Sequence, residues 1–390
     1  MEPDKRTDHN IYFAPMEGIT GHVYRSAHAH HFSGIDRYYL PFIAAHATHT
    51  MKNKEKKDVS PAQNVGLCAI PQVLTKNTDD FLWTVDELTA LGYREINLNF
   101  GCPSPTVTSK GKGAAFLGEP DELDRFLESI FEELQRRGLL AAERTGVGDG
   151  REHDASERAE VGDSSERNAS ERTEVGDSSE RNASERAETG DGGNRNTHAD
   201  KGSLRVSVKT RLGVERTDEW ERIFSIFNRY PISELIVHAR TMREFYNGDT
   251  HIDTFGEILS RSRIPVCYNG NINTAEQYRS ILGRFGDDPH FTGVMIGRGL
   301  IANPALVREI RGGDSLDAAT LRAFHDDVLG GYLEELSGDT HVISKMKELW
   351  WYMGTMFLNA EKPLKRLRKS KNVREYKAAV CEVLRCEIRR

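Results

Sequence analysis

The chain has 390 residues, of which 37% are hydrophobic, so it can bury a full core and form more than one domain. It contains no run of eighteen apolar residues, and its first residues, MEPDKRTDHN, lack an apolar stretch, so neither a membrane span nor a secreted protein is expected. The five cysteines form no C-x-x-C pair, which favours a reducing, cytoplasmic environment over a disulfide framework.

Short apolar runs alternate with helical patterns along most of the chain, which is typical of repeated βαβ units. We expect strands at residues 11–14, 37–41, 67–72, 95–100, 205–209, 234–238, 264–269 and 292–296. Amphipathic helices are expected at residues 121–137, 220–228 and 275–282. Eight strand–helix units predict an α/β fold of the closed (β/α)8 TIM barrel type, with a doubly wound open sheet as the weaker alternative.

An acidic repeat interrupts this pattern at residues 141–202. Ala-Ser-Glu-Arg recurs at residues 155–158, 169–172 and 183–186, a spacing of fourteen residues, in a segment with nine basic and sixteen acidic residues. Large apolar side chains are almost absent from it, so it has no surface whose burial would offset the entropy of ordering. We predict a disordered low-complexity insert in the connection between a helix and the next strand.

The strand pattern ends near residue 312, and only helical patterns follow, including residues 344–358 and 373–389. This predicts a catalytic barrel at residues 1–312 and a smaller helical domain at 313–390, with Trp350 and Trp351 in the core of the latter. Residues 361–390 hold eleven basic and four acidic residues, although the whole chain has a net charge of −7. Such a local excess suits a nucleic-acid backbone, and we expect the contacts from Lys365, Arg366, Arg368 and Lys369.

Candidate site residues, polar or glycine at every strand but the first, stand at the ends of seven of the eight predicted strands, where a (β/α)8 barrel places its active site. They are Pro15 and Met16, Gln72, Asn99 with Gly101 and Cys102, Lys209, His238, Asn269 with Gly270, and Gly297 with Arg298. The turns Asn269-Gly270-Asn271 and Gly297-Arg298-Gly299 follow the last two strands, where such barrels often hold a phosphate. Glycines let backbone N–H groups approach an anion, and an arginine adds paired hydrogen bonds.

Six segments, in order, resemble the successive signatures of the tRNA-dihydrouridine synthase family. They are APMEGIT (14–20), INLNFGCPSPTV (96–107), VKTRLG (208–213), HART (238–241), NGNI (269–272) and IGRGLIANP (296–304). The resemblance covers residues 11–310, apart from the insert, and LKRLRKSKNVREYKAAV (364–380) is similar to the family's C-terminal helical domain. It implies a flavin-dependent oxidoreductase that reduces the C5–C6 double bond of specific uridines in tRNA, with tightly bound FMN and with NADPH as reductant. We expect a cytoplasmic monomer.

The same resemblance assigns roles to individual residues. Cys102 would donate the proton to C5 of uracil, while C6 receives a hydride from the flavin, a group that no side chain can supply. The residues expected to bind FMN are Pro15, Met16, Gln72, Lys209, His238, Asn269, Gly270, Asn271, Gly297 and Arg298. The residues expected to bind the uridine are Asn99, Lys209, His238 and Arg240, although Arg240 could equally serve local structure through a salt bridge.

Two other functions remain open at this point. One is an FMN enzyme for a free pyrimidine, similar to dihydroorotate dehydrogenases, and the other is a tRNA-binding protein without catalysis. A metal site is not expected, because His28, His30, His31, His46 and His49 lack a carboxylate or cysteine partner at ligand spacing in the sequence.

Overall fold

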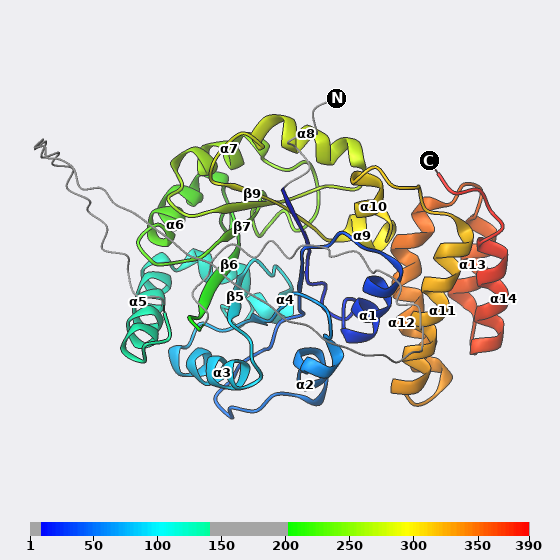
Figure 1. The fold of residues 1–390 in the computed structure, drawn as a ribbon, viewed down its shortest axis with the longest axis horizontal. Helices are drawn as coiled ribbons and strands as arrows, with labels where there is room; N and C mark the ends of the chain where they lie inside the picture. The colour runs from blue at the N-terminus through cyan, green and yellow to red at the C-terminus, as the bar shows by residue number, and fades with distance from the viewer. Residues whose placement is uncertain (1–8, 141–201, 390) are drawn as a thin grey trace, which may run out of the picture. The chain divides into compact units, whose positions relative to one another are not determined.

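The strands of the computed structural model, which describes residues 9–140 and 202–389, form one nine-stranded parallel sheet with helices around it (Figure 1). The order of neighbours is β3-β2-β1-β9-β8-β7-β6-β5-β4. The strands are β1 (Asn10–Phe13), β2 (Arg37–Tyr39), β3 (Ala69–Ile70), β4 (Gln72–Val73), β5 (Glu95–Phe100), β6 (Arg205–Arg211), β7 (Leu235–His238), β8 (Val266–Asn269) and β9 (Phe291–Ile296). The predicted TIM barrel is confirmed, because every predicted strand is present and the order is that of a ring.

The third predicted strand changes partner at Pro71. Before it, β3 pairs with β2, and after it, β4 pairs with β5. Proline has no N–H to donate to a ladder, but the carbonyl of Pro71 still accepts the backbone N–H of Asn97 at 2.9 Å. The two short segments therefore act as one strand that joins both edges of the sheet and closes the ring.

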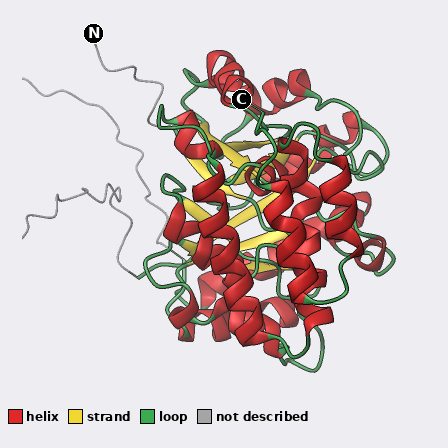
Figure 2. Ribbon diagram, turned by 90° about the vertical axis from the view of Figure 1, so that its right-hand side faces the viewer, coloured by secondary structure: helices red, strands yellow, loops and turns green. Residues whose placement is uncertain are grey.

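Helices cover the outside of the strands (Figure 2). The α-helices of the barrel region are α1 (His22–His31), α2 (Asn53–Val59), α3 (Thr78–Ala90), α4 (Pro105–Thr108), α5 (Pro120–Arg136), α6 (Trp220–Phe227), α7 (Ile252–Arg261), α8 (Ala275–Phe285), α9 (Arg298–Ala302) and α10 (Leu306–Ile310). Four 3-10 helices are η2 (Pro61–Gln63), η3 (Gly113–Gly118), η4 (Thr217–Glu219) and η5 (Gly354–Met356). The predicted helices at 121–137, 220–228 and 275–282 correspond to α5, α6 and α8.

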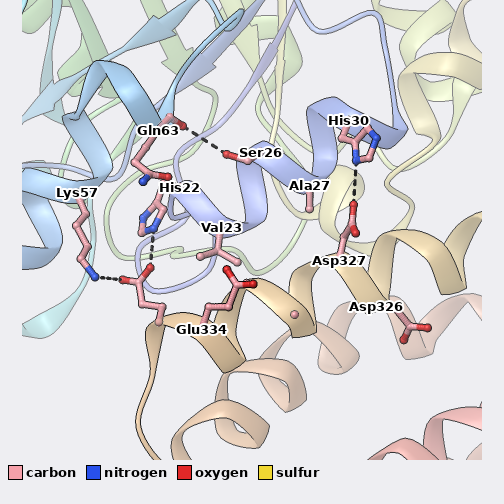
Figure 3. Close-up of a pocket in the computed structure, with 13 residues that line it drawn as sticks. His22, Val23, Ser26, Ala27, His30, Lys57, Gln63, Asp326, Asp327 and Glu334 are labelled. Atoms are coloured by element: carbon pink, nitrogen blue, oxygen red, sulfur yellow. Dashed lines mark hydrogen bonds and ion pairs between the residues drawn. The ribbon is translucent and has the colours of Figure 1, made fainter.

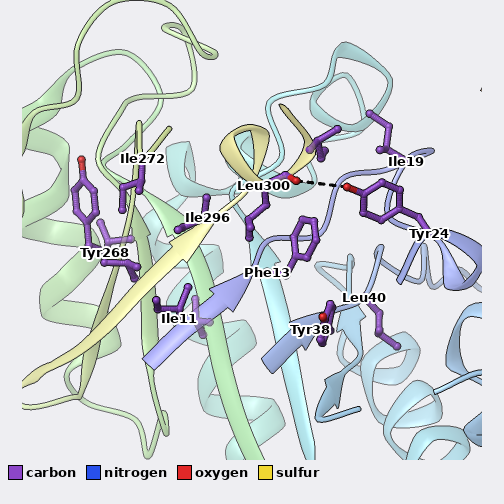
Figure 4. Close-up of a cluster of buried hydrophobic side chains, with 14 of the residues drawn as sticks. Ile11, Phe13, Ile19, Tyr24, Tyr38, Leu40, Tyr268, Ile272, Ile296 and Leu300 are labelled. Atoms are coloured by element: carbon purple, nitrogen blue, oxygen red, sulfur yellow. Dashed lines mark hydrogen bonds between the residues drawn. The ribbon is translucent and has the colours of Figure 1, made fainter. Parts of the chain in front are cut away.

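Side chains of each strand alternate between the helix layer and the barrel interior. Ile11 and Phe13 point outward, where they join the main core under the helices (Figure 4), whereas Tyr12 and Ala14 point inward. The inward apolar cluster comprises Tyr12, Ala14, Tyr39, Ile70, Ile236, Cys267 and Met295. It occupies the side of the interior formed by β1 to β3 and β7 to β9, and the remaining side is polar.

The C-terminal part of the chain is helical, as predicted, and α11 packs beside α1 (Figure 1). Its helices are α11 (Ala318–Glu335), α12 (Asp339–Met353), α13 (Glu361–Lys369) and α14 (Val373–Val383). The predicted helix at 373–389 is too long, because Ile388 leaves the helix and pairs with Phe357 as an antiparallel bridge. The described residues cluster into one compact unit, and the boundary at residue 312 stays a prediction.

The two consecutive tryptophans of α12 differ in environment. Trp350 is buried, as predicted, and donates its indole N–H to the Tyr376 hydroxyl at 2.7 Å. Trp351 is 70% exposed, so its predicted place in the core is wrong. Neighbouring positions of a helix point about 100° apart, so only one of the two can face the bundle.

The predicted disordered insert at 141–202 lies, except for Gly202, outside the described residues. The chain on either side of it is joined by a hydrogen bond of 2.7 Å from the Leu204 N–H to the Leu139 carbonyl. The described residues on either side of the insert follow α5 and precede β6, which is the predicted type of connection. The amino end of β6 lies on the face of the barrel opposite the strand ends that carry the site. Among the described helices, none is both long and apolar enough to span a bilayer.

Candidate active site

A pocket opens at the carboxyl ends of the strands, in the centre of the ring. Its lining residues are Ala14, Pro15, Met16, Gly101, Lys209, Arg211, His238, Tyr246, Asn269, Gly270, Gly297 and Arg298. Eight of the residues predicted to bind the cofactor lie there together, although they come from segments as far apart as β1 and β9. The parallel barrel accounts for this, because it brings all carboxyl ends of its strands to one rim.

Two glycine turns form one side of the pocket. A Cβ at Gly270 would lie 2.1 Å from the Tyr268 hydroxyl, so no larger residue fits there without moving that ring. Beside it, Arg298 donates to the Asn271 side-chain carbonyl at 2.9 Å, and Asn269 donates to the Met295 carbonyl at 2.7 Å. These bonds fix the turns while leaving further guanidinium N–H groups of Arg298 able to bind an anion.

Cations surround the rest of the pocket. Burial, followed by the charge of Arg211, lowers the pKa of the Lys209 ammonium to about 7. Burial, followed by the charges of Arg211 and Lys209, lowers the pKa of His238 well below its usual value, and Arg240 donates to the Nε2 of that ring at 3.2 Å. His238 is therefore neutral, with Nδ1 as its donor nitrogen. So many positive groups around one cavity favour a negatively charged ligand.

Cys102 lies on the loop that follows β5, and Asn99 holds this loop. The side-chain carbonyl of Asn99 accepts the backbone N–H groups of Gly101 and Cys102, both at 3.0 Å. The Cys102 carbonyl accepts the Ala114 N–H at 3.0 Å, and a Cβ at Gly113 would approach that carbonyl to 2.7 Å. Burial raises the pKa of the Cys102 thiol, so it stays protonated at neutral pH and can act as an acid.

Five predicted site residues do not line the pocket as the described residues form it: Gln72, Asn99, Cys102, Asn271 and Arg240. Gln72 and Asn99 are buried and joined by a hydrogen bond of 2.6 Å. Arg240 donates to the carbonyls of Asn247 and Gly248, so it holds the loop after β7 through carbonyls, whereas the expected alternative was a salt bridge. Their roles toward a cofactor or substrate stay predictions.

Sequence reasoning missed two pocket residues, Arg211 and Tyr246. Arg211 donates to the Gly101 carbonyl at 2.8 Å and lies two residues after Lys209, so the two-residue period of a strand could have placed both on one face. Tyr246 lies on the loop after β7, with the guanidiniums of Arg211 and Arg298 at 5.4 Å and 4.8 Å from its ring centre. No periodicity marks a loop residue of this kind.

The predicted basic contacts lie on α13, apart from the pocket. Lys365, Arg366, Arg368 and Lys369 are all exposed. Arg366 forms an ion pair with Glu382 at 2.7 Å, whereas the other three have no acidic partner within residues 9–140 and 202–389. Three of the four predicted contacts are therefore uncompensated within these ranges, as is Lys362 on the same helix, and such a local excess of positive charge suits a phosphate backbone.

The fold supplies a carboxylate to both histidine groups, which the sequence did not reveal, and in the second group His49 Nε2 lies 3.3 Å from Asp80. His30 Nδ1 and His31 Nε2 lie 2.9 Å and 2.7 Å from the same oxygen of Asp327, where α1 meets α11 and borders a polar cavity of about 620 Å³ (Figure 3). The argument that these histidines lack a partner is therefore wrong. The two hydrogen bonds account for the arrangement without an ion, and His30 is 73% exposed, so the expectation of no metal stays a prediction.

The family model and the relatives found by sequence point to one family. The sequence model of the dihydrouridine synthase (Dus) family matches residues 12–147 and 196–388. The tRNA-dihydrouridine(16) synthase of Neisseria meningitidis serogroup B is 23% identical over 98% of this chain and 96% of its own length. The probable tRNA-dihydrouridine synthase 2 of Bacillus subtilis is 32% identical over 64% and 56%, and the tRNA-dihydrouridine synthase B of Pasteurella multocida is 23% identical over 76% and 68%, in the same order.

The lowered pKa of Lys209 predicts a pH-dependent stability difference in protein stripped of ligands. Between about pH 7 and the usual lysine pKa of 10.5, the unfolded chain binds a proton that the folded site does not, so Lys209 destabilises the fold most at pH 7 and below. Lys209→Met should raise Tm by roughly a few degrees at pH 6.5, and this gain should shrink toward pH 10. Thermal unfolding at several pH values measures it. A gain that is constant with pH would mean that the ammonium is well solvated.

Proposed function

Because this chain belongs to the dihydrouridine synthase family, we propose that it reduces the C5–C6 double bond of specific uridines in tRNA, with FMN as its bound cofactor and NADPH as reductant. The observation that carries the proposal is the convergence of Lys209, His238 and Arg298 with two glycine turns in one pocket at the barrel mouth. The relatives' printed names point to tRNA as the substrate, and neither a free-pyrimidine enzyme nor an inactive tRNA-binding protein is favoured.

The pocket residues suit FMN. Gly270, Gly297 and Arg298, with Asn269 and Asn271 as their fixed neighbours, offer backbone N–H groups and a guanidinium for its phosphate. Pro15 and Met16 offer an apolar surface for the ring, and Lys209 offers a cation beside it. When bound, FMN supplies the hydride that no side chain can provide. A reduced flavin is anionic, so it would offset the cost of the buried Lys209 ammonium.

Cys102 is the side chain that we assign to the proton. Saturation of the double bond requires a hydride at C6 and a proton at C5, and the raised pKa of the Cys102 thiol keeps that proton available. Lys209 and His238 offer N–H donors that can hydrogen-bond the uracil carbonyls, and Asn99 secures the loop on which Cys102 lies. In this assignment, Lys209 and His238 orient the uracil ring, and the Cys102 thiol supplies the proton to C5.

The uridine of a folded tRNA has to leave its stack to enter such a pocket. Exposed aromatic side chains can replace the lost stacking, and Tyr246 on the rim and Trp351 on α12 are 44% and 70% exposed. We assign the tRNA backbone to Lys365, Arg368 and Lys369, with Arg366 as a weaker contributor because of Glu382. Action as a monomer in the cytoplasm is part of the same proposal.

Replacing the thiol should separate the two half-reactions. In Cys102→Ala, reduction of the flavin by NADPH should stay normal, whereas its reoxidation by unmodified tRNA should slow on the order of a hundredfold or more, the usual contribution of a general acid. Stopped-flow absorbance of the flavin follows both steps. Free uridine in place of tRNA is the control, and equal turnover of both would instead indicate a free-pyrimidine enzyme. Normal reoxidation by tRNA in Cys102→Ala would mean that the proton comes from another group.

Neutralising the three predicted contacts of α13 that have no acidic partner among the described residues should weaken tRNA binding. With Lys365, Arg368 and Lys369 changed to glutamine, fewer counterions are released, so the slope of log affinity against log salt should fall by roughly two. Arg279→Gln, at an exposed position of α8, is the control and should leave the slope unchanged. Filter binding at several salt concentrations measures both. If the two variants behave alike, the tRNA does not contact α13.

A further inference from the structure

Five buried polar residues form a continuous column through the polar side of the barrel interior. They are Glu95, Asn97 and Asn99 of β5, Gln72 of β4 and Ser207 of β6, and we call them the amide column. Gln72, Asn97 and Ser207 are 0% exposed, and Glu95 and Asn99 are 4% and 6% exposed. The three β5 residues are spaced by two, so all of them point inward.

Hydrogen bonds connect the column from the Cys102 loop to the bottom of the barrel. Asn99 accepts the N–H groups of Gly101 and Cys102 and donates to the Gln72 carbonyl at 2.6 Å. Gln72 donates to the Asn97 carbonyl at 2.7 Å, and Asn97 donates to the Ser207 hydroxyl at 3.0 Å. The Ser207 hydroxyl donates to Glu95 at 3.3 Å. In each of these contacts between column members, the residue nearer the Cys102 loop is the donor and the next one is the acceptor.

Both ends of the column fix its direction. At the bottom, the Glu95 carboxylate pairs with Arg37 at 3.2 Å and Arg205 at 2.5 Å, and an ionised carboxylate can only accept. At the top, the backbone N–H groups of Gly101 and Cys102 can only donate. If one amide reversed, a donor would face a donor on one side of it and an acceptor would face an acceptor on the other, so the reversal would have to spread to one of these ends. The orientation of Asn99 therefore depends on residues up to Glu95, which lies at the opposite end of β5.

The column is unusual for its position, since the interior of such a barrel is normally filled by bulky aliphatic layers. Apolar residues do fill the opposite side, including Ile70, Ile236 and Met295. Buried amides are costly unless they are hydrogen-bonded, and a satisfied network specifies one geometry. Among the described residues, the buried side-chain atoms without a partner belong to Arg25, Tyr39 and Ser233, none of which is in the column.

We propose that the amide column positions Cys102 and that Asn97 is a positioning residue for the protonation of the substrate. Asn97 reaches Cys102 only through Gln72 and Asn99 and lines no part of the pocket formed by the described residues. The role in protonation rests on the proposed function, whereas the control of the Cys102 loop does not. Loss of the Asn97 amide frees Gln72 to rotate, and Asn99 then loses its fixed partner.

The test compares Asn97→Ala with Ile70→Ala, which truncates an inward side chain of β3 outside the column. Both flavin-loaded variants are treated with iodoacetamide across a range of pH, and modification of the Cys102 peptide is followed by mass spectrometry. In Asn97→Ala, we expect the midpoint of the pH profile to move by about half a unit or more, a threefold change in rate, because the thiol has moved relative to its surroundings. Ile70→Ala should lower Tm and keep the wild-type profile.

Two further measurements are the alkylation profiles of two Ser207 variants and the rate of flavin reoxidation by tRNA. Ser207→Ala is a milder change for the case in which Asn97→Ala does not fold, and Ser207→Thr, which keeps the hydroxyl, should retain the wild-type profile. In Asn97→Ala and Ser207→Ala, reoxidation of the flavin by tRNA should slow roughly tenfold to a hundredfold, the effect of a displaced catalytic group, while reduction by NADPH should not change.

The outcomes separate this inference from the proposed function. A wild-type alkylation profile in both Asn97→Ala and Ser207→Ala would overturn the positioning role of the column. A shift of equal size in Ile70→Ala would also overturn it, since any core damage would then suffice. If wild-type protein fails to reduce uridine in tRNA, the proposed function is wrong, and the alkylation comparison still decides whether the column holds Cys102.

Discussion

Closure of the strand ring by the backbone of β3 and β4, on either side of Pro71, is the constraint on which the site depends. One short segment pairs with β2 on one side and with β5 on the other, so the sheet has no free edge. An open sheet would leave the ends of β1 and β5 apart, and the pocket needs side chains from both halves of the ring. The same segment places Gln72 beside Asn97 and Asn99, so closure of the barrel and control of the Cys102 loop share three residues.

The buried cations at the barrel mouth lower the stability of the fold but favour the binding of an anion. Lys209, Arg211 and Arg298 surround one pocket, and burial lowers the pKa of both Lys209 and Arg211, with a further contribution from the charge of Arg211 at Lys209 and of Arg240 at Arg211. Burial makes the charged forms of these groups unfavourable, and a negatively charged ligand removes part of that free-energy cost. This relief contributes to the binding free energy of the ligand. The glycine turns and the Arg298–Asn271 hydrogen bond fix the positions of the groups that can bind an anion. Together with the charge, they suit a phosphorylated cofactor whose ring accepts electrons.

The sequence predicted the features that are local or periodic. Apolar runs located each strand, and expected residues at the strand ends such as Lys209, His238 and Arg298 lie in the pocket because parallel strands end on one rim. Contacts between segments that are far apart in the chain could not be predicted from the sequence. Asp327 meets His30 and His31 only after α11 packs on α1, and Glu382 neutralises Arg366 only after α13 packs on α14. Trp351 and the end of α14 were misjudged because a helical pattern does not say which face is covered or where a bridge such as Phe357–Ile388 ends it.

We propose that this protein makes dihydrouridine in tRNA through Cys102. The most direct measurement maps dihydrouridine by mass spectrometry in tRNA from cells with the gene, without it, and with a Cys102→Ala copy. We expect that dihydrouridine at one or a few defined positions disappears without the gene, returns with the wild-type copy and stays largely absent with Cys102→Ala. Unchanged dihydrouridine at every position after loss of the gene, in cells where no other enzyme modifies the same sites, would contradict it.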